Sequence, residues 1–82
     1  MKVKKKFKYD DIELRIVERE ELYMNSGSTV RMTRVMAPNG GTVPIQIQRK
    51  QTLKSIAEET IRILNGFKER GADIKKELTK KL

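Results

Sequence analysis

The most distinctive chemistry in the sequence is a set of basic side chains at strand-like spacing, Lys4, Lys6 and Lys8. Alternate residues of an extended strand point to opposite faces, so these lysines share one face while Val3, Phe7 and Tyr9 face a core. Cationic groups gathered on one face displace the counterions around nucleic-acid phosphates, which gives affinity without sequence reading. The spacing therefore favours a basic binding surface, although charged side chains also keep an exposed sheet face in solution and deter edge pairing.

Residues for other kinds of chemistry are missing. The chain contains no histidine and no cysteine, and it has no glycine-rich phosphate loop and no nucleophile motif. Asp10, Asp11 and Glu13 form a tight carboxylate group, but their place between two alternating segments favours a polar turn over a cation site. We predict that the protein is not an enzyme and that it has no metal site and no cofactor.

The composition of the chain indicates which class of partner its charge favours. The 82 residues carry 19 Lys and Arg against 11 Asp and Glu, a formal net charge of +8, which favours polyanionic partners such as nucleic acid or an acidic protein surface. The length fits one small domain over residues 1–82. Because no segment has the length and apolarity of a membrane span and cysteine is absent, we expect a cytoplasmic protein with no membrane partner.

Two alternating segments, residues 3–9 and 12–17, are expected to form a hairpin closed by Asp10 and Asp11. The expected pairs are Tyr9 with Ile12, Phe7 with Leu14 and Lys5 with Ile16 on the inner face, and Lys8 with Glu13 and Lys6 with Arg15 on the outer face. Lys6 and Arg15 are then like-charged neighbours, a pairing that costs stability and points weakly to function.

A second hairpin is expected from strands near residues 29–37 and 42–49, joined by a Pro-Asn-Gly-Gly turn at 38–41. Pairing Ala37 with Thr42 places one set of residues inward: Val30, Met32, Met36, Val43, Ile45 and Ile47. It places another set outward: Arg31, Thr33, Val35, Pro44, Gln46 and Gln48. Pro44 lacks a backbone donor, so its strand should be an edge. Arg34 falls at an inward position, which suggests a bulge or a place at the sheet margin.

The last part of the chain has helical periodicity. Thr52 can cap a helix whose apolar residues recur every three or four positions from Leu53 to Phe67, with Gly71 as the cap at its carboxyl end. Asp73 can start a short second helix in a basic tail over residues 72–82. The predicted fold is therefore α+β: a mainly antiparallel sheet of about four strands, covered on one face by the long helix. A small SH3-like barrel followed by the helix is the alternative.

The uncovered sheet face is the predicted site. Its expected nucleic-acid-binding residues are Lys4, Lys6, Lys8, Arg15, Arg31, Thr33, Gln46, Gln48 and Lys50. No aromatic side chain is placed on this face, so a duplex fits it better than stacked single-stranded bases. The expected function is that of a non-catalytic nucleic-acid-binding protein with a regulatory or architectural role, and the basic tail from Lys75 to Lys81 would add phosphate contacts.

A second interpretation places a protein partner on the same face. Val17, Val35 and Pro44 would form a small apolar spot within the basic surround. Such a spot suits a regulator or inhibitor that binds an acidic protein surface, or the seam of a homodimer formed by edge pairing of the sheet.

Overall fold

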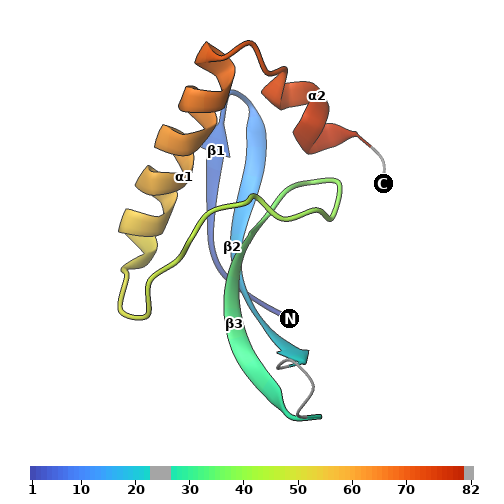
Figure 1. Ribbon diagram of the computed structural model, residues 1–82, viewed down its shortest axis with the longest axis vertical. Helices are drawn as coiled ribbons and strands as arrows, with labels where there is room; N and C mark the ends of the chain where they lie inside the picture. The colour runs from blue at the N-terminus through green and yellow to red at the C-terminus, as the bar shows by residue number, and fades with distance from the viewer. Residues whose placement is uncertain (23–26, 81–82) are drawn as a thin grey trace.

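The computed structural model describes residues 1–22 and 27–80. In this part of the chain an antiparallel sheet of three strands, in the order β1-β2-β3, is combined with two helices (Figure 1). The strands are β1 (Lys2–Tyr9), β2 (Ile12–Leu22) and β3 (Thr29–Met36), and the helices are α1 (Leu53–Glu69) and α2 (Ile74–Thr79). The α+β class is confirmed, and no helix among the described residues could cross a membrane.

The first hairpin forms in the predicted register, with Tyr9 opposite Ile12 and Lys6 opposite Arg15. Asp10 and Asp11 have φ angles of 52° and 68°, as a type I′ turn requires, and this turn matches the twist of the strands that it joins. A register shift between Val3 and Lys5 marks a bulge at Lys4. Because of this bulge, Val3 pairs with Val17 on the outer face and not, as predicted, on the inner face.

The expected fourth strand over residues 42–49 is not confirmed. Thr42 forms an isolated bridge with Met36, and the Val43 N–H donates to the Val35 carbonyl at 2.8 Å. The Ile45 N–H then donates to the Val43 carbonyl at 2.8 Å, closing a three-residue turn around Pro44. Since proline has no N–H to continue the ladder, the chain leaves the sheet edge and runs to α1 (Figure 1). The sheet is open, with β1 and β3 as its edges, in place of the alternative barrel.

The faces of β3 are the reverse of those predicted. Val35 pairs with Ile16, which belongs to the core, and Arg34 pairs with Val17 on the outer face. The cause lies in the turn after β3, where Thr42 lies opposite Met36 and not opposite Ala37. A one-residue shift exchanges the two faces of a strand. It follows that Arg31 and Thr33 were wrongly placed on the outer face, and that the misfit of Arg34 came from the same shift.

The core lies between the inner face of the sheet and the layer formed by the helices and residues 43–47. Its buried residues are Tyr9, Ile12, Leu14, Ile16, Val35, Ala37, Val43, Ile56, Ala57, Leu64, Ile74 and Leu78. The buried hydroxyl of Thr60 donates to the Ile56 carbonyl at 2.8 Å, so its burial leaves no polar group unsatisfied. The Tyr9 hydroxyl donates to Asn65 Oδ1 at 2.7 Å and thereby joins β1 to α1.

α1 begins and ends near residues that the sequence indicated, and α2 begins where the sequence indicated. Thr52 caps α1 by accepting from the Ser55 N–H, and Asp73 caps α2 by accepting from the Lys76 N–H. Gly71, with a φ of 93°, follows α1, and the bonds from Gly71 to Lys68 and from Ala72 to Phe67 form a Schellman motif. The basic tail expected over residues 72–82 contains the short helix Ile74–Thr79. Its last two residues, 81–82, lie outside the described residues.

Candidate nucleic-acid interface

The outer face of the sheet lies opposite the layer of helices. The register assigns to it five basic residues, which are Lys6, Lys8, Arg15, Arg19 and Arg34. Its acidic residues are Glu13 and Glu21, and its apolar residues are Val3, Val17, Val30, Met32 and Met36. Because α1, α2 and residues 43–47 pack on the other face, no described element covers this one.

One corner of the outer face has three cations around a single carboxylate. Glu13 Oε1 lies 3.3 Å from Arg15 Nε and 4.0 Å from Lys6 Nζ, so two cations share it. Lys8, which lies opposite Glu13 in the register, makes no ion pair with a described residue. The like-charged pair of Lys6 and Arg15 is therefore present as predicted, and Glu13 neutralises only part of the local positive charge.

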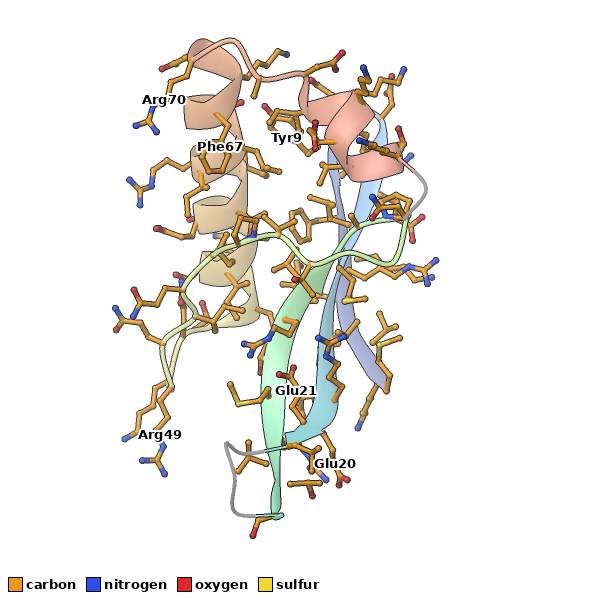
Figure 2. All side chains as sticks on the ribbon, turned by 45° about the vertical axis from the view of Figure 1, so that its right-hand side comes forward. Tyr9, Glu20, Glu21, Arg49, Phe67 and Arg70 are labelled. Carbon is orange, nitrogen blue, oxygen red and sulfur yellow. The ribbon has the colours of Figure 1, made fainter. Side chains whose placement is uncertain are left out.

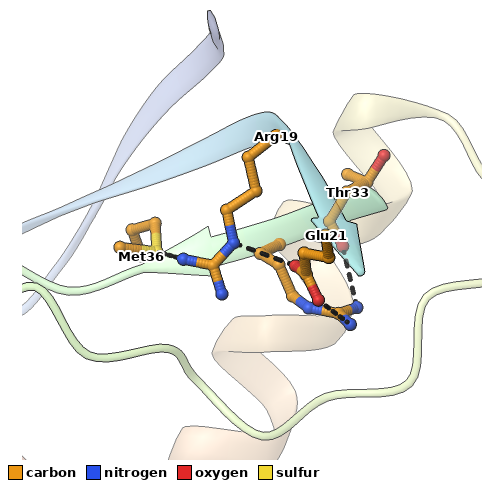
Figure 3. A network of polar contacts seen from close by, with 5 residues as sticks. Arg19, Glu21, Thr33 and Met36 are labelled. Carbon is orange, nitrogen blue, oxygen red and sulfur yellow. Dashed lines mark hydrogen bonds and ion pairs between the residues drawn. The ribbon is translucent and has the colours of Figure 1, made fainter. Parts of the chain in front are cut away.

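A second group of outer-face residues holds two guanidinium groups in fixed positions (Figure 3). Arg19 Nε donates to Glu21 Oε2 at 2.9 Å, and Arg34 Nη2 donates to Glu21 Oε1 at 3.1 Å. Arg19 Nη1 also contacts Met36 Sδ at 3.8 Å, while Arg34 Nη1 donates to the Thr33 carbonyl at 3.3 Å. These bonds fix both arginine side chains beside the apolar residues of the face.

The pKa of Glu21 lies below the usual value for a glutamate. The main cause is the hydrogen bond from Arg19; partial desolvation opposes it, and the charge and hydrogen bond of Arg34 lower the pKa further. The carboxylate is therefore held in its charged form at neutral pH. Figure 2 shows Glu20 and Glu21 near the far end of β2, beyond the part of the sheet that α1 accompanies.

Sequence reasoning missed Arg19 and Arg34. If the alternation of β2 is continued past Val17, Arg19 falls on the same outer face as Arg15. The inward misfit of Arg34 in the predicted register was the second signal, because a one-residue shift turns that arginine outward. Neither signal fixes the register by itself.

The structure separates the predicted site residues into three groups. Lys6, Lys8 and Arg15 lie together on the outer face, as expected. Lys4, at the bulge, and Arg31 both contact Glu18: Lys4 Nζ is 3.3 Å from Oε2, and Arg31 Nε is 3.6 Å from Oε1. Thr33 lies opposite Glu18 in the register and so belongs to this second group.

The third group belongs to the segment that follows β3 and precedes α1 in the sequence. Gln46, Gln48 and Lys50 line a polar cavity of about 520 Å³ together with Arg49, Gln51, Ser55 and Glu59. Figure 2 shows Arg49 and Arg70 pointing outward at the two ends of the layer that contains α1. Gln46, Gln48 and Lys50 belong to the helix side of the molecule because their segment leaves the sheet at Pro44.

The apolar spot expected from Val17, Val35 and Pro44 does not form. Val17 and Val35 lie on opposite faces of the sheet and are 0% and 1% exposed. Pro44 is exposed, but the register shift places Val35 in the core. On the outer face, Val17 instead lines a cavity of about 280 Å³, whose other residues include Met1, Arg15, Met36 and Pro38.

We compared the chain with family models, curated proteins and solved structures, and none of them matches it.

Proposed function

We propose that this protein is a non-catalytic nucleic-acid-binding protein whose outer sheet face contacts the phosphates of a duplex. The observation that carries this proposal is the excess of cations on a face that no described element covers. The face carries five basic residues and two glutamates. Lys6 and Arg15 share Glu13, while Lys8, opposite Glu13, makes no ion pair with a described residue. Phosphate oxygens would supply the negative charge that this corner lacks, and counterion release would supply the affinity.

The kind of nucleic acid follows from the side chains of the face. The described aromatic residues, Phe7, Tyr9 and Phe67, belong to the core or pack against it, so they offer no platform for unstacked bases. Arginine binds phosphate in a bidentate manner, and the bonds to Glu21 keep Arg19 and Arg34 in place at the surface. A duplex is therefore the preferred partner in either a regulatory or an architectural role.

The test is fluorescence anisotropy with labelled duplex DNA, duplex RNA and single strands across a salt series. If all five cations contact phosphates, the logarithm of the affinity should fall against the logarithm of the salt concentration with a slope of about −4.5. In the double variant Lys6→Gln/Arg15→Gln we expect a slope of about −2.7, because two phosphate contacts are lost.

The matched control is Lys54→Gln/Arg70→Gln, which removes the same charge from exposed positions at the two ends of α1. It should leave the slope within experimental error of the unmodified protein. Equal losses in the two double variants would show that net charge alone drives binding. Absence of duplex binding at low salt would contradict the proposed function.

A further inference from the structure

The free edge of β3 presents backbone groups that no described neighbouring strand pairs with, and one of them, the Thr33 carbonyl, accepts from Arg34 Nη1 at 3.3 Å. The bonds from Val43 to the Val35 carbonyl and from Ala37 to the Gly41 carbonyl show that Val35 and Ala37 direct their backbone groups away from β2. In an antiparallel strand this direction alternates with each residue, so Thr29, Arg31 and Thr33 direct theirs to the same edge. Within the described part of the chain, no backbone hydrogen bond joins these three residues to a segment outside the sheet.

The two edges of the sheet differ in their protection. β1 carries a bulge at Lys4 and further lysines along its length, and both features discourage an added strand. The β3 edge from Thr29 to Thr33 contains no lysine and no proline, and its pairing with β2 shows no register shift. At the other end of β3 the place beside Val35 is occupied by Val43. The open part of the edge therefore extends over five residues.

We propose that this edge binds an extended acidic segment of a partner protein as an added antiparallel strand. Charge complementarity identifies the occupant: the side chain of Arg31 is 72% exposed, with Nε 3.6 Å from Glu18, and the chain carries a net charge of +8. A residue of the added strand opposite Arg31 would be Asp or Glu, while residues opposite Val30 and Met32 would be apolar. This site lies at the sheet edge and does not depend on duplex binding by the outer face.

A second copy of the chain is a poorer occupant of the same edge. Pairing residues 29–33 with themselves in antiparallel orientation places Arg31 opposite Arg31 of the other copy. Like charges directly opposite each other are unfavourable, and each copy adds a further net charge of +8. An acidic strand avoids both costs.

The first test uses a peptide with the central sequence Thr-Val-Glu-Val-Thr, with its Glu opposite Arg31. N-methylation of the Glu and of both Thr residues blocks the N–H groups that face β3, whereas N-methylation of both Val residues modifies N–H groups that face away. We expect the first modification to weaken binding about tenfold or more and the second to change it about twofold or less. Equal effects of the two modifications, or equal binding of a scrambled peptide, would overturn the proposal.

The second test is made on the protein. Thr29→Pro removes one N–H at the free edge, at the first residue of β3, where a proline is tolerated. It should weaken peptide binding and leave duplex affinity unchanged. In the unmodified protein, saturating peptide should slow amide exchange at Arg31 and Thr33, a result that does not require the variant to fold. If the peptide leaves amide exchange at Arg31 and Thr33 unchanged, or if only duplex DNA slows it, the proposal of an added strand is refuted.

Discussion

Glu21 shows how one side chain organises the outer face, because its two carboxylate oxygens bind Arg19 and Arg34. The folded pKa of Glu21 lies below its usual value. A lowered pKa stabilises the fold at pH values above the unfolded pKa, which is about 4.3. This contribution is lost as the pH falls through the folded pKa, when the carboxylate takes up a proton.

This linkage predicts the behaviour of Glu21→Gln. The variant should melt at a lower temperature than the unmodified protein at pH 7, and the difference should shrink as the pH falls from about 5 to about 2. Thermal unfolding at a series of pH values measures it. Glu20→Gln is the control, since Glu20 makes no ion pair with a described residue. If the melting temperatures of Glu21→Gln and the unmodified protein differ by the same amount down to pH 2, the charge of Glu21 does not contribute to stability.

At the scale of the elements, Asn39 connects the turn after β3 with the end of α2. Its Nδ2 donates to the Glu77 carbonyl at 3.1 Å and to the Lys80 carbonyl at 2.7 Å, while its Oδ1 accepts from the Gly41 N–H at 2.9 Å. The burial of Ile74 and Leu78 is the other attachment of α2 to the core. The turn after β3 is thus also a support of the last helix.

Two substitutions at Asn39 separate these roles. Asn39→Asp keeps the acceptor for Gly41 but loses the two donors to α2, whereas Asn39→Ala loses all three bonds. We expect each exposed hydrogen bond to contribute about 1 kcal/mol or less to stability, and we expect faster amide exchange in α2 for both variants. Exchange should rise within residues 37–43 only for Asn39→Ala. Unchanged exchange in α2 for both variants would mean that apolar packing alone holds the helix.

The elements also show what the sequence could predict. The register of β1 against β2 was predictable because a two-residue turn at Asp10 and Asp11 links two alternating segments. The ends of α1 were predictable because Thr52 and Gly71 have clear capping chemistry. Both signals are local, and each one depends on only a few neighbouring residues.

The faces of β3 and the fate of residues 42–49 were not predictable in the same way. The turn after β3 contains two glycines, so its residue types do not distinguish pairing of Thr42 with Met36 from pairing with Ala37. A one-residue difference exchanged the faces and moved Arg31 and Thr33 away from the basic surface. The sequence therefore placed Lys6, Lys8 and Arg15 correctly on one face, and it was wrong in bringing Gln46, Gln48 and Lys50 to that face.

At the scale of the whole molecule, the net charge of +8 is divided between two layers. The outer face holds five cations, and the helix side carries others, including Arg49, Lys54 and Arg70. Net charge attracts a polyanion to either side, so overall affinity by itself does not identify the interface. The proposed function therefore depends on which arginines contact the phosphates.

The most direct measurement is an NMR titration of the arginine Nε–Hε signals with a short duplex, followed at low and at physiological salt. We predict that the signals of Arg15, Arg19 and Arg34 shift and that those of Arg49, Arg62 and Arg70 do not. Added salt should reverse the shifts, because phosphate contacts release counterions. Shifts confined to Arg49, Arg62 and Arg70, or no shifts at low salt, would contradict the assignment of the outer face as a nucleic-acid interface.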